Sequence, residues 1–124
     1  MNHLMLIGAG GFLGAIARYT VSGWVQQRFG GAFPLGTLIA NVVGCLIIGA
    51  LMSLVEDHPL LLPPWRAFIA VGILGAFTTF STFGYETFAL IEDRRTLAAG
   101  ASVLLNVVLG LLAVLLGRAI VRAL

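Results

Sequence analysis

The third of four apolar stretches in this chain contains the sequence GAFTTFSTF at residues 75–83. A helix that only has to dissolve in a bilayer needs Leu, Ile, Val and Ala, because polar groups are costly in hydrocarbon. Here three threonines and a serine stand among glycine and phenylalanine residues instead. The stretch therefore predicts a transmembrane helix that is interrupted for a functional reason.

The composition of the whole chain predicts a membrane protein. Hydrophobic residues make up 60% of its 124 residues, charged residues make up 10%, and the mean hydropathy is +1.06. Four stretches approach the roughly 20 residues that cross the hydrocarbon core. They comprise residues 4–26, 35–55, 67–91 and 97–117. We therefore expect an all-α membrane protein in which residues 1–124 form a single domain of four transmembrane helices, the third of them broken.

Arginine is distributed evenly between the two predicted sides of the membrane. One side carries Arg66, Arg118 and Arg122, and the other carries Arg28, Arg94 and Arg95, while lysine is absent. Because orientation follows the Arg and Lys asymmetry of short loops, we expect the chain to insert in both orientations. Two inverted copies would recreate the inverted repeat that is common in transporters, so an antiparallel, dual-topology homodimer is expected.

Neutral polar side chains form one stripe on each of two predicted helices. The stripes consist of Thr37, Asn41 and Gly44 on the second helix and of Ser102, Asn106 and Gly110 on the fourth. One interpretation is packing, in which each asparagine makes an interhelical hydrogen bond worth about 1 kcal/mol. The other is a conduit for a small anion, whose neutral donors hold the ion without trapping it. The residues alone leave both interpretations open.

Phe80 and Phe83 lie three residues apart, and Phe77 precedes them by the same step. They share a face if the backbone is locally helical. Aromatic stripes usually pack in a core, but the positive edges of the rings also suit a small anion that has lost its water. The sequence permits both roles.

Two other classes of function remain open at this stage. The first is a small dual-topology, proton-coupled exporter that uses Glu86, the one chargeable residue among the polar side chains of the third helix. The second is a subunit that does not transport, in which the polar stripes only bind a partner.

Three motifs, in this order, resemble the bacterial fluoride channel family called Fluc or CrcB. They are GGFLGAIARY at residues 10–19, GTLIANVVG at residues 36–44 and GAFTTFSTF at residues 75–83. The resemblance extends over essentially the whole chain and implies a channel rather than an enzyme. It implies passive fluoride export, protection from fluoride toxicity and an antiparallel homodimer with two pores. The expected location is the bacterial inner membrane, as a multi-pass protein surrounded by lipid and without a nucleic-acid partner.

The same resemblance implies roles for individual residues in fluoride conduction. Phe80 and Phe83 would line the fluoride path, and the side-chain amide of Asn41 would donate to the ion. The hydroxyls of Ser81 and Thr82 would add further donors along a polar track.

Other residues are implied at the edges of this path. Possible pore or vestibule residues are Arg18, Thr37, Glu86, Ser102 and Asn106. For Arg18, snorkelling of its side chain to the membrane interface is an open alternative. A sodium ion at the dimer centre would be held by the main-chain carbonyls of Gly75 and Thr78, where a break at residues 75–79 frees carbonyl oxygens.

Overall fold

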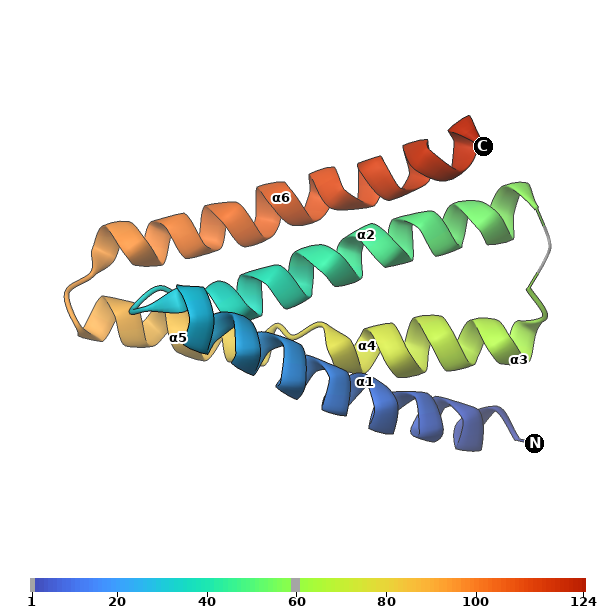
Figure 1. Cartoon of the computed structure of the whole chain (residues 1–124), viewed down its shortest axis with the longest axis horizontal. Coiled ribbons are helices and arrows are strands. Elements are labelled where there is room, and N and C mark those ends of the chain that lie inside the picture. Colours follow the sequence, from blue (N-terminus) through green and yellow to red (C-terminus); the bar gives the residue numbers. More distant parts are fainter. Residues whose placement is uncertain (1, 59–60) are drawn as a thin grey trace.

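The computed structural model describes residues 2–58 and 61–124, and these form helices joined by short connections (Figure 1). Helix α1 (His3–Val25) continues into the π-helical segment η1 (Gln26–Gly30), and α2 (Leu35–Asp57) follows. Next come α3 (Pro63–Arg66), the π-helical segment η2 (Ala67–Leu74), α4 (Gly75–Phe77) and α5 (Ser81–Glu92). Helix α6 (Thr96–Ala123) completes the chain.

Within the described residues, four helical segments are long and apolar enough to cross a membrane. They are His3–Gly30, Leu35–Asp57, Pro63–Glu92 and Thr96–Ala123. The predicted all-α class and the four membrane-spanning helices are thereby confirmed. The third segment begins at Pro63 rather than at Ala67, because Pro63 and Pro64 occupy the first helical positions, where a missing N–H breaks no helical hydrogen bond.

The four segments run back and forth, so that both ends of the chain lie at the same end of the bundle. The start of α1 and the end of α6 lie at the right of Figure 1, with the end of α2 and the start of α3, while η1 and the connection from α5 to α6 lie at the opposite end. At the first end, Arg118 pairs with Glu56 at 3.1 Å and Arg122 pairs with Asp57 at 3.2 Å. These ion pairs join the end of α2 to the end of α6.

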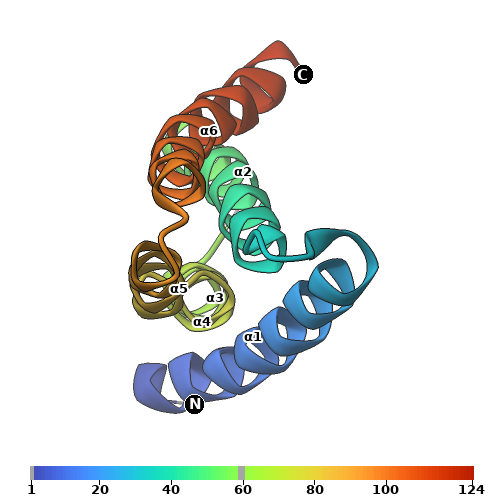
Figure 2. The same ribbon diagram turned by 90° about the vertical axis from the view of Figure 1, so that its left-hand side faces the viewer.

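Glycine residues set how closely the helices approach one another. Helix α2 packs along α6, and α1 packs against η2 and α4 (Figure 2). A Cβ atom added at Gly49 of α2 would overlap the backbone of Val114, and one added at Gly117 of α6 would overlap the backbone of Leu46. The α2–α6 contact therefore depends on glycine from both helices, as expected for close helix packing in membranes.

Substituting Gly49 by alanine is expected to destabilise the folded chain by about 1–3 kcal/mol, the usual cost of overpacking. The added methyl group would stand 2.9 Å from the Val114 carbonyl carbon, and backbone cannot move aside as a side-chain tip can. Thermal unfolding in detergent measures the effect. Gly100→Ala is the matched control on α6, because its added Cβ would meet no atom within 4 Å beyond its chain neighbours and the nearby backbone of its own helix. Equal stability of the two variants would contradict the packing role of Gly49.

The chain leaves the helical conformation between α4 and α5. Thr78 has extended backbone angles (φ −85°, ψ 157°), and the following helix begins at Ser81. Gly75, which the sequence places in a break at residues 75–79, is helical and is the first residue of α4. An added Cβ at Gly44 of α2 would overlap the Thr78 methyl group, so the absence of a side chain at Gly44 lets α2 approach this segment.

The isolated chain buries little of its apolar surface. In the most apolar 18 residues of each membrane-spanning segment, between 11% and 28% of the residues are buried within the chain. Large side chains such as Leu97, Phe80 and Tyr19 are more than 80% exposed. Most of the helix surface therefore faces lipid or another protein.

Candidate functional site

A small pocket lies beside the non-helical residues 78–80 and has a volume of about 250 Å³. Its lining comes from α2, α5, α6 and the non-helical residues themselves, and comprises Asn41, Cys45, Thr78, Thr79, Phe80, Phe83, Asn106 and Val107. None of these residues is acidic or basic, apart from Cys45, whose thiol can ionise. The fold thus brings together Asn41, Thr78, Phe80, Phe83 and Asn106, which the sequence had singled out separately.

The two phenylalanines of this pocket differ from the one that precedes them. The rings of Phe80 and Phe83 have centroids 5.6 Å apart and are tilted by 59°. Phe80 is 83% exposed and Phe83 is half-buried, whereas Phe77 is only 8% exposed and belongs to the core. The regular stripe expected for a continuous helix stops at Phe77, because the backbone at Thr78 is extended.

The side-chain amide of Asn41 binds both the N–H and the carbonyl of Thr79. Its Oδ1 accepts from the Thr79 N–H at 2.8 Å, and its Nδ2 donates to the Thr79 carbonyl at 3.0 Å. In a continuous helix these two groups would bind neighbouring turns. Asn41 therefore stabilises the non-helical segment by replacing hydrogen bonds that the backbone has lost.

Asn41 also makes the interhelical bond that the packing interpretation expects. Its Nδ2 donates to Oδ1 of Asn106 at 3.0 Å, which connects α2 to α6. Asn106 in turn donates from Nδ2 to the main-chain carbonyl of Ser102 at 2.8 Å. The Ser102 side chain is 1% exposed and lines none of the pockets described here, so the fourth-helix stripe contributes Asn106 alone to the small pocket.

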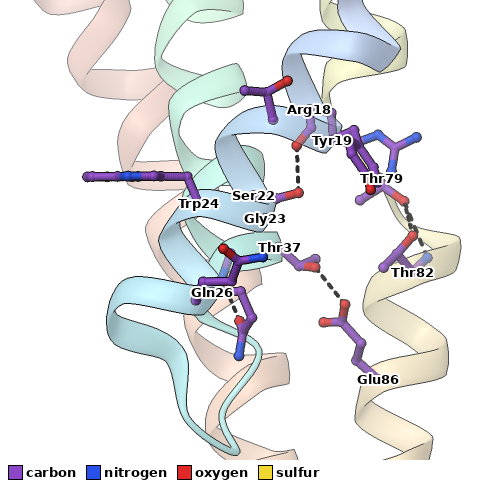
Figure 3. A pocket seen from close by; sticks show the side chains of 13 residues that line it. Arg18, Tyr19, Ser22, Gly23, Trp24, Gln26, Thr37, Thr79, Thr82 and Glu86 are labelled. Carbon is purple, nitrogen blue, oxygen red and sulfur yellow. Dashed lines mark hydrogen bonds between the residues drawn. The ribbon is translucent and has the colours of Figure 1, made fainter.

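A larger open pocket of about 510 Å³ lies on the other side of Thr79, between α1, α2 and α5 (Figure 3). Thr37 donates from its hydroxyl to Oε1 of Glu86 at 2.8 Å, and both residues line this pocket with Thr82 and Arg18. Oε2 of Glu86 is buried and has no hydrogen-bond partner among the described residues. The predicted vestibule residues Arg18, Thr37 and Glu86 thus lie in one cavity.

Arg18 points from α1 toward the end of α4. Its Nε donates to the Ala76 carbonyl at 3.0 Å. That carbonyl belongs to the last turn before the non-helical segment, where four helical carbonyls lack their usual partners and attract positive charge. Arg18 thereby satisfies one of these carbonyls while lining the larger pocket.

Thr79 lines both pockets, a position that the sequence reasoning did not single out among its site residues. Its hydroxyl donates to Oγ1 of Thr82 at 3.0 Å and accepts from the Thr82 N–H at 3.3 Å, which caps the start of α5. Thr79 was visible in the sequence as the second threonine of the FTTF run at residues 77–80. Ser81 is exposed and lines neither pocket.

Gln26 is a second residue that the sequence reasoning missed. Its side-chain nitrogen donates to the carbonyls of Gly31 and Phe33, and its Oε1 accepts from the Gly36 N–H at 3.0 Å. These bonds hold the turn after η1 and cap the start of α2 beside the larger pocket. No sequence pattern marks this role, because it depends on a turn in which Gly31 adopts φ +58°.

Comparison with known proteins places this geometry in context. Residues 5–118 match the family model described as "CrcB-like protein, Camphor Resistance (CrcB)". A protein of Rhizobium meliloti (strain 1021) named "Fluoride-specific ion channel FluC" is 44% identical over 99% of this chain and 98% of its own length. Proteins with the same name from Geotalea uraniireducens (strain Rf4) and Chloroflexus aurantiacus (strain ATCC 29366 / DSM 635 / J-10-fl) are 44% and 45% identical; they cover 100% and 94% of this chain and 100% and 93% of their own lengths.

Proposed function

The chain belongs to the CrcB family, and from this premise we propose that it is a fluoride-selective ion channel. It conducts fluoride passively out of the cell and so protects the cell from fluoride toxicity. It is a channel and not an enzyme. The observation that carries the proposal is the neutral pocket, which includes Asn41, Phe80, Phe83 and Asn106. It occurs in a chain that is related over its whole length to proteins named as fluoride channels.

The chemistry of fluoride explains why such a pocket is suitable. Fluoride is small and strongly hydrated, so a selective pore has to replace its water with well-placed donors and still release the ion. In the small pocket the Asn41 amide and the positive edges of Phe80 and Phe83 provide neutral contacts, and the Thr82 hydroxyl lines the larger pocket. Arg18 supplies a positive charge that attracts anions to the larger pocket, which Glu86 also lines.

Fluoride release from vesicles tests this function. Purified protein is reconstituted in vesicles loaded with fluoride or with chloride, and the released ion is measured with a selective electrode. We expect rapid release of fluoride and little release of chloride. Retention of fluoride equal to that of empty vesicles would refute the channel and favour a subunit that does not transport, and a large chloride leak would refute the selectivity.

The working unit that we propose is an antiparallel homodimer in the bacterial inner membrane, with two pores. Three arginines at each end of the molecule support insertion in both orientations. The exposed ring of Phe80 leaves the small pocket open on one side, which a second copy would close. Labelling of an N-terminal tag from both sides of sealed vesicles is expected, and labelling from one side only would refute this arrangement.

A sodium ion at the centre of the dimer is the proposed cofactor, held by the main-chain carbonyls of Gly75 and Thr78. Among the hydrogen bonds of the described residues, none reaches either carbonyl oxygen, because the Thr79 N–H binds Asn41 and the Thr82 N–H binds Thr79 Oγ1. Neutral carbonyl oxygens suit a hard monovalent cation, whereas calcium sites usually include carboxylates. The ion would coordinate main-chain carbonyl oxygens that lack a hydrogen-bond partner and that lipid cannot satisfy.

Exchange of sodium for choline is expected to lower the thermal stability of the purified dimer. A bound ligand stabilises the folded protein by about 2.7 kcal/mol at a hundred times its dissociation constant, and removal abolishes that contribution. Unfolding temperature is measured in matched chloride salts of sodium, choline and potassium. Identical unfolding in sodium and choline would contradict the sodium site without bearing on fluoride conduction.

Glu86→Gln is expected to retain fluoride flux within about threefold of the original protein. Glutamine preserves an oxygen that accepts from the Thr37 hydroxyl and removes the group that can carry a charge or a proton. A proton-coupled exporter would lose transport completely in this variant. The vesicle assay, run with and without a pH gradient, therefore separates the channel from the exporter.

A further inference from the structure

The Asn41 amide has no free donor in this structure. A carboxamide nitrogen carries two hydrogens, and both are used, one by the Thr79 carbonyl and one by Oδ1 of Asn106. An anion in the small pocket can bind Asn41 only if one of these two acceptors is displaced. The two acceptors differ greatly in how easily they can leave.

The bond to the Thr79 carbonyl is the harder one to break. It closes a ring with the bond from the Thr79 N–H to Asn41 Oδ1, and this ring satisfies both backbone groups of a residue outside the helices. Opening it would leave backbone polar groups unpaired at membrane depth, which is costly. The bond to Asn106 is a single bond between two neutral side chains, and such interhelical bonds contribute modestly in membranes.

Asn106 is fixed in the orientation that makes it an acceptor. Its Nδ2 donates to the Ser102 carbonyl on its own helix, so its Oδ1 faces Asn41. Both asparagines line the small pocket beside Phe80 and Phe83, so an ion in the pocket has access to this bond. An anion is a stronger acceptor than a neutral carbonyl, because charge-assisted hydrogen bonds are about twice as strong.

We propose that Asn106 is the resting acceptor for the Asn41 amide and that fluoride takes its place on entering the small pocket. Asn106 is thus a positioning residue that keeps the Asn41 hydrogen aimed into the pocket and sets how tightly the ion is held. This exchange rests on the proposed fluoride conduction. It adds a competitor within the protein, which weakens binding and favours release.

The asparagine content of the chain allows a direct test on the unaltered protein. The sequence contains three asparagines, Asn2, Asn41 and Asn106, so protein labelled with [15N]asparagine gives three side-chain nitrogen signals, each with a pair of amide hydrogens. During titration with fluoride we expect the Asn41 and Asn106 signals to shift with one common midpoint. Asn2, whose Oδ1 accepts from the Leu4 N–H on the surface, is the internal control, and chloride at equal concentration is the control ion.

Each outcome of the titration has a definite meaning. A shift of Asn41 without a shift of Asn106 would overturn the exchange, as would silence of both signals in protein that releases fluoride from vesicles. Silence together with vesicles that retain fluoride would refute the proposed function as well. The two failures are therefore distinguishable.

Asn106→Leu provides a second readout, because leucine has a similar volume and no acceptor. We expect the half-saturating fluoride concentration of the flux to fall about fivefold, since the Asn41 hydrogen no longer has a competing partner. Val103→Leu, one turn earlier on α6 and outside the small pocket, is expected to leave that concentration unchanged. An unchanged or higher value in Asn106→Leu would overturn the proposal, whereas a purely structural role would reduce the maximal flux without lowering the half-saturating concentration.

Discussion

Replacing either Phe80 or Phe83 by isoleucine is expected to lower fluoride flux by about tenfold or more. Isoleucine fills much of the same space but has no ring edge with partial positive charge, so the ion loses a favourable contact where it has shed its water. Loss of about 1.4 kcal/mol of stabilisation at the barrier corresponds to a tenfold decrease in rate. The initial rate of fluoride release from vesicles measures the change.

The structure indicates that the Phe80 substitution leaves the fold intact. Phe80 is 83% exposed within the chain, so its replacement removes little internal packing. Phe88→Ile is the matched control, because Phe88 is a 56% exposed phenylalanine on the same helix α5 as Phe83 and does not line the small pocket. Size-exclusion chromatography shows whether the proposed dimer persists. Wild-type flux in both pocket variants would show that the rings do not line the path.

The membrane-spanning architecture was predictable because it depends on the summed hydrophobicity of each segment. Each segment needs about 20 apolar residues, and neither the exact helix ends nor the packing partners affect that requirement. The ends themselves were less predictable. Pro63 and Pro64 lie outside the predicted span of residues 67–91, but at the first positions of a helix proline is well tolerated.

Five of the eight residues that line the small pocket were singled out in the sequence, but the hydrogen bonds between them were not predicted. Asn41 and Asn106 stood out because polar residues are rare at membrane depth. Their direct bond depends on how α2 and α6 are placed side by side, and glycine contacts such as Gly49 against Val114 determine that placement. Spacing along one helix carries no information about such a contact.

The non-helical residues illustrate the same limit at finer scale. Hydroxyl-rich residues after Gly75 indicated that the helix is interrupted, yet in the structure Gly75 is helical and Thr78 is extended. The position is set by tertiary partners, because Asn41 binds Thr79 and Gly44 makes room for the Thr78 methyl group. Local preference alone does not specify which peptide leaves the helix.

Asn41→Asp is expected to reduce fluoride flux by about a hundredfold or more. An aspartate carboxylate keeps the oxygen that accepts from the Thr79 N–H but has no hydrogen for the Thr79 carbonyl, for Asn106 or for an anion. It also places a negative charge in the small pocket. Two like unit charges 4 Å apart repel by about 4 kcal/mol at an effective dielectric constant of about 20, which exceeds the 2.7 kcal/mol that a hundredfold decrease requires.

Two companion variants separate the loss of the donor from the gain of charge. Asn41→Leu removes the amide without adding charge, so a smaller decrease in flux than in Asn41→Asp would identify repulsion as the additional factor. Asn106→Asp adds the same charge to the same pocket but retains the bonds from Asn41 to Thr79. We expect this variant to unfold at a higher temperature than Asn41→Asp, because both backbone groups of Thr79 keep their partners.

Full fluoride flux in Asn41→Asp would mean that no anion approaches this side chain, and the neutral pocket would then be a packing feature between α2 and α6. The added charge repels the ion only if the ion passes within a few ångströms of Asn41, because water and salt screen charges at longer range. The experiment therefore locates the ion relative to one atom group. Combined with the isoleucine variants, it distinguishes a path that follows the phenylalanine edges alone from one that also uses the Asn41 amide.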